Sequence, residues 1–247
     1  MRVKAVVAYD GTGYSGFQFQ TNAPSIQADL ERVIEKLTAT PTRILAAGRT
    51  DAGVHALGQV IAFDPVWRHS LADLQRGMNA LLPEQISVPE LVEAPPDFHP
   101  RFDARRRRYS YSLYRAPVRN PLVERYSLHL YGPLDVERMQ RAARSLGGVQ
   151  DFAAFGSPPQ GEKTVREVFA AVWREDGDWL RFTIEANAFL YRMVRMIVGT
   201  LLRVGKGALS VAEFVEILQS QDRRRAGPAV AAKGLVLEDV SYAEQKS

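Results

Sequence analysis

The chain has 247 residues, enough for one or two domains with a sizeable hydrophobic core, and no cysteine. Disulfide bonds, thiolate nucleophiles and cysteine-rich zinc or iron-sulfur sites are therefore excluded. No apolar run comes near the ~20 residues that a transmembrane helix needs, so the sequence does not predict a membrane protein. The first ten residues enter a strand pattern at once, without the charged leader and apolar core of a secretory signal, which favours the cytoplasm.

Basic residues outnumber acidic ones by four, and most of them are arginine: lysine accounts for six of the 32 basic residues and arginine for 26. The guanidinium group matches phosphate oxygens and stacks on bases, so this excess permits nucleic-acid binding. A genome or growth-temperature bias toward arginine explains the composition equally well, and composition alone does not separate the two.

The first half of the chain predicts elements in the order β-α-β-β-α-β. Ser25 and Ser70 stand directly before helical patterns, where a hydroxyl group can accept a bond from the first helical turn. Pro89 has no amide hydrogen for a central ladder, so we expect the strand around it at a sheet edge. The expected elements are strands 3–10, 42–48, 58–64 and 86–94 and helices 25–39 and 70–82.

The second half predicts a similar order of elements. Its clearest signal is a hairpin of two alternating strands around Asp176 and Gly177. The expected elements are strands 105–115, 165–175, 179–186 and 234–243 and helices 135–148, 189–205 and 210–220, the first of which ends at glycine. The two halves share no sequence identity that we can detect, so the repeat is architectural.

We therefore predict an α+β fold made of two split-βαβ, ferredoxin-like halves, with a mainly antiparallel sheet, helices packed on it and a cleft between the halves. The predicted boundary places residues 1–104 in the N-terminal half and 105–247 in the C-terminal half. A long cleft between two sheets suits an extended polymer as ligand.

Three common nucleotide or metal motifs fail on inspection. The segment VVAYDGTGYSG resembles the DxDGT loop of aspartyl-phosphate enzymes, but Ala8 occupies the nucleophile position. The segment RVGKGALS lacks P-loop spacing, because Gly207 follows Lys206. The four histidines lie far apart in sequence without metal-ligand spacing. We expect neither a nucleotide cofactor nor a metal.

The phrase GRTDAGVHA, residues 48–56, sets Asp51 in a glycine-bracketed turn after a predicted strand. Strand ends commonly display functional side chains, but an aspartate in such a turn is also a frequent turn former. From the residues alone, both interpretations stand.

The same phrase resembles the active-site signature of the pseudouridine synthases, and specifically of the tRNA pseudouridine synthase A family. The resemblance covers nearly the whole chain. It extends to the segments YDGTGYSGFQFQ, SIQADLERVI, DFHPRFDARRRRYSYSLY, NAFLYRMVRMIVGTLLRVG and KGLVLEDVSY. The chain departs from the family pattern at Phe17, Ala62, Arg192 and Met196, where tryptophan, histidine, histidine and asparagine are expected.

The resemblance implies a uridine-to-pseudouridine isomerase with Asp51 as its catalytic carboxylate. It assigns Arg195 to the site as the neighbouring guanidinium, which lowers a carboxylate pKa by about 1 to 3 units and favours the ionised form. It places Tyr109 against the extruded base, where a core tyrosine is the alternative. The resemblance also implies that the target uridine flips out of the RNA stem and that Arg49 enters the space it leaves, although on chemistry alone Arg49 could bind a flanking phosphate.

The helical pattern over 189–205 places Arg192 and Arg195 on one face, apart from the apolar stripe, and a solvated arginine face is the alternative to a binding role. We expect the sugar-phosphate track to use Arg192 and the basic cluster upstream in the chain. That cluster comprises Arg101, Arg105, Arg106, Arg107 and Arg108. The resemblance supplies the partners: the anticodon arm of tRNA, modified at uridines conventionally numbered 38 to 40, and a second copy of the chain in a homodimer.

Two other functions compare with this interpretation, and the residues fit the first of them better than the second. A noncatalytic RNA-binding module or folding chaperone could use the same basic and aromatic side chains. A metal-dependent nuclease would need clustered carboxylates, which the sequence around Asp51 does not offer. The residues also leave both chemical routes of the isomerase open, a covalent adduct of Asp51 or a glycal formed by removal of the C2′ proton.

Overall fold

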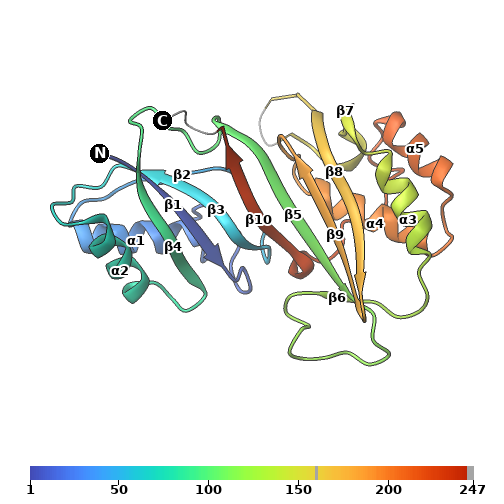
Figure 1. Cartoon of the computed structure of the whole chain (residues 1–247), viewed down its shortest axis with the longest axis horizontal. Coiled ribbons are helices and arrows are strands. Elements are labelled where there is room, and N and C mark those ends of the chain that lie inside the picture. The colour runs from blue at the N-terminus through green and yellow to red at the C-terminus, as the bar shows by residue number, and fades with distance from the viewer. Residues whose placement is uncertain (159–160, 244–247) are drawn as a thin grey trace. The chain divides into compact units, whose positions relative to one another are not determined.

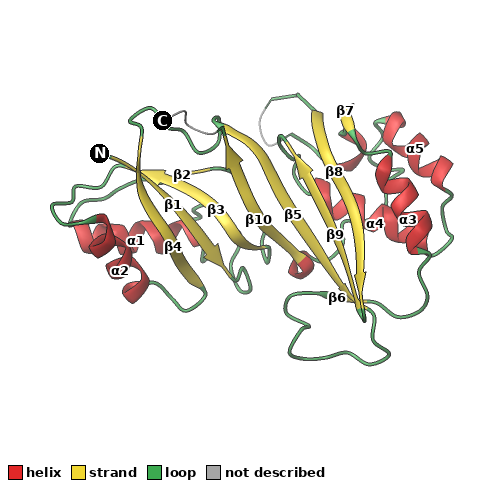
Figure 2. Ribbon diagram, in the orientation of Figure 1, coloured by secondary structure: helices red, strands yellow, loops and turns green. Residues whose placement is uncertain are grey.

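The structure, a computed structural model, describes residues 1–158 and 161–243. It is a mixed α+β protein, which confirms the predicted fold class, and its helices and strands are drawn in Figures 1 and 2. The chain divides into two compact units. Unit 1 comprises Met1–Arg105 and the C-terminal segment from Val236, and unit 2 comprises Arg106–Leu235.

Unit 1 contains the predicted β-α-β-β-α-β order, with the strands of its sheet in the order β4-β1-β3-β10 and β2 paired to β3. Strand β1 runs antiparallel to both β3 and β4, and β4, which contains Pro89, lies at the edge as expected. The elements are β1 (Arg2–Tyr9), α1 (Ile26–Thr38), β2 (Leu45–Ala46), β3 (His55–Phe63), α2 (Leu71–Leu81), β4 (Ile86–Ala94) and β10 (Leu235–Tyr242).

The last strand of the chain joins the first unit. Strand β10 pairs in parallel with the start of β3, with Val236 opposite His55 and Leu237 opposite Ala56. Gly58 of β3 permits this pairing, because a Cβ there would lie 2.4 Å from the carbonyl oxygen of Glu238. The predicted C-terminal half, 105–247, therefore differs from unit 2 in this strand.

Both helices of unit 1 begin at the predicted serine caps. The Ser25 hydroxyl accepts a bond from the Ala28 amide, and Ser70 forms a reciprocal capping box with Asp73. Gly77 of α2 faces Leu37 of α1, and a Cβ there would lie 3.0 Å from the leucine side chain. The glycine thus lets the two helices approach closely. The fully buried core side chains include Leu30, Ile34, Ile61, Phe63 and Leu74.

Unit 2 builds its sheet in the order β5-β9-β8-β7, all antiparallel, with β6 paired in parallel to β5. Helices α3, α4 and α5 pack on one another, and α3 also contacts β8 (Figure 1). The elements are β5 (Ala104–Tyr114), β6 (Leu128–His129), α3 (Val136–Arg144), β7 (Gly148–Asp151), β8 (Val165–Asp176), β9 (Trp179–Ala186), α4 (Met193–Gly205) and α5 (Val211–Ser220), with 3₁₀ turns at Ala153–Phe155 and Ala232–Gly234.

The predicted hairpin is confirmed, because Asp176 of β8 pairs with Trp179 of β9 and Gly177 takes a positive φ of 55°. The predicted helix 189–205 is too long at its start. Arg192 takes a left-handed φ of 62°, and the Tyr191 amide donates to the Ser157 carbonyl at 2.9 Å. This long-range bond holds the segment before Met193 out of the helix.

Other predicted ends also shift. The strand expected over 42–48 is only two residues long, and the helix expected over 135–148 ends at Arg144, before its glycines. Among the described residues, no helix is long and apolar enough to cross a membrane.

Candidate active site

Asp51 lies in unit 1, in the loop between β2 and β3. Along this loop Arg49 is exposed, Thr50 is buried and Asp51 is half-buried. The Val54 amide donates to the Asp51 carbonyl at 3.1 Å, and Gly53 takes a positive φ of 74°. These two features close a tight turn directly after the aspartate, which leaves its side chain partly accessible to a substrate.

The segment after β1, residues 10–17, packs backbone against backbone on this loop. The Phe17 amide donates to the Thr50 carbonyl at 3.1 Å. A Cβ at Gly16 would lie 2.8 Å from the Thr50 oxygen, and one at Gly11 would lie 2.1 Å from the Val54 oxygen. Only glycine fits at these two positions without a shift of the backbone.

A histidine of β3 and an aspartate of the segment 10–17 meet next to the turn. The Nδ1 atom of His55, the first residue of β3, lies 3.0 Å from Oδ1 of Asp10 and also faces the Gly11 amide at 3.1 Å. His55 is buried, with 4% of its surface exposed. These contacts tie the histidine of the GRTDAGVHA phrase to the N-terminal segment, which gives His55 a structural role.

A buried hydroxyl contact that the sequence did not indicate joins the end of β1 to this loop. The Tyr9 hydroxyl lies 2.8 Å from Oγ1 of Thr50. Burial raises the pKa of Tyr9 to about 12, against smaller lowering contributions from hydrogen bonds with Thr50 and Gln59. The tyrosine is therefore neutral at physiological pH.

Tyr109 and Arg195 lie in unit 2. Tyr109 of β5 is buried, 8% exposed, and its ring meets Phe189 edge-on, with centroids 5.0 Å apart and an interplanar angle of 84°. Tyr111 is fully buried, as expected for a core tyrosine, and its hydroxyl donates to the Ala231 carbonyl at 2.8 Å. Burial raises the pKa of Tyr111, and the charge of Arg195 lowers it by less.

Arg195 lies in the first turn of α4, where Nε donates to the Val230 carbonyl at 2.7 Å. Arg192 stands just before that helix rather than in its body, exposed, with its guanidinium 4.9 Å from the centroid of the Tyr191 ring. The predicted placement of Arg192 within the helix is therefore wrong: it is the N-cap residue, and the Met196 amide donates to its carbonyl at 3.0 Å. Met196, a departure from the family pattern, is buried and contacts Nε of Arg223 through its sulfur at 3.3 Å.

The arginine run of β5 divides by strand alternation. Arg107 is buried, 9% exposed, and donates to the Asn187 carbonyl at 2.6 Å. Arg106 and Arg108 project to the other face and bind the two carboxylate oxygens of Glu185 at 2.9 and 3.2 Å. Burial alone would raise the pKa of Glu185, but bonds from both guanidinium groups outweigh it and lower the pKa.

The remaining predicted RNA contacts lie at the end of unit 1. Arg105 is exposed, and Arg101 lies with its guanidinium 5.8 Å from the centroid of the Phe102 ring. Phe102 itself is 75% exposed. An exposed aromatic ring beside a guanidinium is a surface that nucleic-acid bases can stack on.

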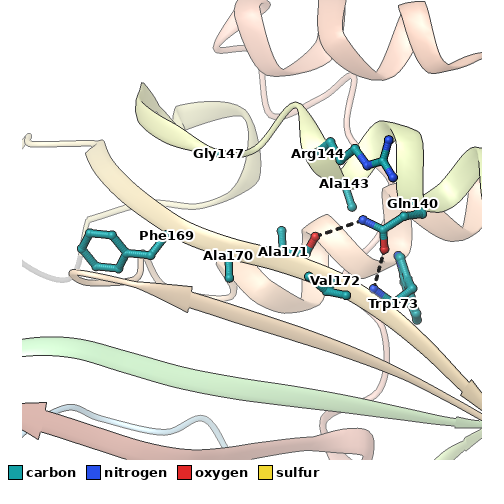
Figure 3. A pocket seen from close by; sticks show the side chains of 9 residues that line it. All are labelled: Gln140, Ala143, Arg144, Gly147, Phe169, Ala170, Ala171, Val172 and Trp173. Carbon is teal, nitrogen blue, oxygen red and sulfur yellow. Dashed lines mark hydrogen bonds between the residues drawn. The ribbon is translucent and has the colours of Figure 1, made fainter.

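A separate pocket of about 540 Å³ opens in unit 2 between α3 and β8 (Figure 3). The Gln140 side chain joins α3 to β8 in this pocket. Its oxygen accepts a hydrogen bond from the Trp173 amide at 2.7 Å, and its nitrogen approaches the Ala171 carbonyl at 3.4 Å. None of the predicted site residues lines this pocket. Within residues 1–158 and 161–243, no three histidine or acidic side chains cluster as a metal site would require.

Comparison with known proteins shows which family the chain resembles. A family model for tRNA pseudouridine synthase matches residues 5–103 and 142–243. A tRNA pseudouridine synthase A from Chloroflexus aurantiacus is 45% identical over 97% of this chain and 88% of its own length. Those from Syntrophomonas wolfei and Myxococcus xanthus are each 43% identical over 98% of this chain, covering 98% and 92% of the relatives.

Among solved structures, a chain of a Cbf5-Nop10-Gar1 complex aligns with a TM-score of 0.33 and 13% identity, over 81% of this chain and 54% of that one. This weak likeness adds nothing to the assignment. The family model and the relatives carry it, since they extend over nearly the whole length on both sides. The chain therefore belongs to the tRNA pseudouridine synthase family, whose members isomerise uridine to pseudouridine in tRNA.

Proposed function

We propose that this enzyme modifies uridines 38, 39 or 40 in the anticodon arm of tRNA in the cytoplasm, with Asp51 as its catalytic carboxylate and without a metal or nucleotide cofactor. The observation that carries the proposal is the intact GRTDAGVHA phrase, in which Asp51 stays half-exposed between a buried Thr50 and a closed turn. A carboxylate that is both accessible and held on each side suits a reaction at a positioned substrate atom.

The reaction exchanges one bond for another without redox change. The C1′–N1 bond breaks with its electron pair going to N1, and the uracil turns until C5 faces C1′. The C5–C1′ bond then forms, C5 loses a proton and N1 gains one. Asp51 either adds covalently to the substrate or removes the C2′ proton to give a glycal. Both routes need an ionised carboxylate, and Arg195 is the proposed guanidinium that favours this form.

A uridine inside a stem must leave the stack before its C1′ and C5 atoms are accessible, at a cost of a few kcal/mol. Stacking on an aromatic ring returns about 1 to 3 kcal/mol per base, and Tyr109 is the proposed ring. Its edge-on contact with Phe189 keeps the tyrosine in a fixed orientation. Arg49, exposed two residues before Asp51, is the proposed occupant of the vacated space.

The proposed contacts to the sugar-phosphate backbone come from the half-buried Arg101 and from the exposed Arg105, Arg106, Arg108 and Arg192. Affinity from such contacts falls as salt rises and depends little on sequence. The Glu185 carboxylate orients the guanidinium groups of Arg106 and Arg108 through two bonds. Arg107, which is buried on the Asn187 carbonyl, is proposed to support this strand rather than to meet solvent-side phosphates.

The proposed assembly is a homodimer. Sedimentation equilibrium at micromolar concentration should then give twice the 27.6 kDa mass of the chain. A mass of one chain under conditions of full activity would overturn the dimer and leave the proposed chemistry untouched.

The substrate and chemistry are tested with anticodon-arm RNA that carries tritium at C5 of its uridines, incubated with the enzyme and a chelator. We expect tritium release, because the new bond forms at C5. Replacing uridine 38, 39 or 40 singly with cytidine should lower the release only at modified positions. Tight binding without release would instead indicate a noncatalytic RNA-binding protein, and strand cleavage that the chelator stops would indicate a nuclease.

A further inference from the structure

A buried hydroxyl pair lies one residue before the proposed catalytic aspartate. Tyr9 is the last residue of β1, 4% exposed, and its ring lies 6.1 Å from that of Phe17. Its hydroxyl is 2.8 Å from Oγ1 of Thr50, which is 7% exposed. In so enclosed a place a hydrogen bond is costly to lose, since neither hydroxyl can turn to water instead.

A second buried side chain holds the same loop. Gln59 of β3, with no exposed surface, donates from Nε2 to the Gly48 carbonyl at 2.9 Å. Side chains from β1 and β3 therefore hold the loop at residue 48 and again at residue 50. Two buried side-chain contacts on one short loop restrict the arrangements that its backbone can take.

The backbone of Thr50 is held from the other side. Its carbonyl accepts the Phe17 amide at 3.1 Å, and Gly16 leaves room for that approach. Thr50 thus has both its side chain and its carbonyl in fixed contacts, and the carbonyl belongs to the peptide unit that begins Asp51. That peptide plane fixes the position of the Asp51 Cα atom and so limits the directions in which its side chain can leave the loop.

We propose that Tyr9 and Thr50 are positioning residues, whose buried hydroxyl contact sets the direction of the Asp51 carboxylate toward the reacting ribose. This inference rests on the proposed role of Asp51 and goes beyond it. Neither hydroxyl touches the substrate in this account. A misplacement of a reacting group by about 1 Å can lower the rate about 100-fold. The contact between Tyr9 and Thr50, one residue before Asp51, can therefore have a large effect on kcat.

The test removes the hydroxyl groups one at a time with nearly isosteric variants, Tyr9→Phe and Thr50→Val, and together in the double variant. Thr50→Ser keeps the hydroxyl and is the conservative rescue. Tyr14→Phe is the matched control, because Tyr14 is in the same N-terminal segment and its hydroxyl donates at 2.9 Å to Asp29, a residue of α1 rather than of the Asp51 loop. All variants are assayed well below their measured Tm.

We expect kcat for tritium release to fall at least about tenfold in Tyr9→Phe and in Thr50→Val, with KM and the Kd for tRNA within about twofold of wild type. The double variant should lose no more than the worse single variant, since both lose one shared contact. Thr50→Ser should restore most of kcat, and Tyr14→Phe should keep all of it.

Wild-type kcat in folded Tyr9→Phe and Thr50→Val would overturn the inference. So would a loss confined to KM, or an equal loss in Tyr14→Phe, because a general weakening of the fold would produce either. Asp51→Asn in the same assay separates this inference from the proposed function. If Asp51→Asn forms no product while Tyr9→Phe and Thr50→Val keep full kcat, the positioning role alone fails. If Asp51→Asn forms product, the proposed role of Asp51 fails first.

Discussion

Arg195 and Val230 are joined by two hydrogen bonds, although 35 residues separate them. Nε of Arg195 donates to the Val230 carbonyl at 2.7 Å, and the Val230 amide donates to the Arg195 carbonyl at 3.2 Å. The guanidinium plane is thereby oriented by the loop before β10. A side chain held in this way offers its charge in one fixed direction.

Arg195→Lys keeps the positive charge but replaces the planar guanidinium group with an ammonium group. The variant has no donor at the position of Nε, so it cannot reproduce the bond to the Val230 carbonyl. We expect the rate of pseudouridine formation at saturating tRNA to fall about 10- to 100-fold, with a small change in Tm. Single-turnover kinetics with labelled tRNA measures this directly. A lysine variant with the wild-type rate would show that charge alone matters at this position.

Gly16→Ala places a Cβ 2.8 Å from the Thr50 carbonyl oxygen, at a φ of 105°. We expect a loss of more than about 1 kcal/mol in unfolding free energy and a loss of activity, since the contact displaces the loop that carries Asp51. Gly13→Ala is the control, because Gly13 also has a positive φ, 82°, but nothing lies within 4 Å of its Cβ position. The unfolding free energies are measured by urea denaturation. Equal losses of unfolding free energy in Gly16→Ala and Gly13→Ala would show that the close contact with Thr50 is not the cause.

The lowered pKa of Glu185 predicts that the stability of the protein depends on pH. Its pKa is lowered in the folded state, so its stabilisation is present above the unfolded-state pKa of about 4.3 and is lost as pH falls through the lower folded pKa. Glu185→Gln should therefore have a lower Tm than wild type at pH 7, and the two Tm values should converge toward pH 3. Thermal unfolding across that range checks the sign. A difference that grows on acidification would contradict it.

Arg174 and Arg181 lie directly opposite each other on β8 and β9, both exposed. Neither guanidinium has an acidic partner in the part of the chain that the structure describes, and like charges at opposed positions destabilise a sheet. We expect Arg181→Thr to raise the unfolding free energy by about 0.2 to 1 kcal/mol at low salt. The gain should shrink in high salt, because screening removes the repulsion. An equal gain at every salt concentration would point to another cause.

Local patterns were sufficient to predict much of the fold. Serine caps at 25 and 70 mark two helix starts, and the alternating strands around Gly177 form the hairpin as expected. Patterns of this kind involve neighbouring residues only, so they can be read without knowing the tertiary structure. The capping hydroxyl groups and the turn glycine each act within a few residues along the chain.

The features that could not be predicted depend on partners far away in sequence. The left-handed start of α4 at Arg192 follows from a bond between Tyr191 and Ser157, and β10 joins unit 1 by pairing with β3. In the site, the sequence phrase around Asp51 resembles a known signature, whereas Tyr9 is predicted only as part of a strand. Its contact with Thr50, 41 residues away, exists only in the folded chain.

The central claim is that the Asp51 carboxylate performs the chemistry. Asp51→Asn keeps the size of the side chain and removes its charge, so we expect the variant to fold and to bind tRNA with the affinity of the wild-type enzyme. Tritium release from anticodon-arm RNA labelled at uridine C5 is the most direct measurement. The account predicts no release above background from Asp51→Asn. Release at the wild-type rate would contradict it.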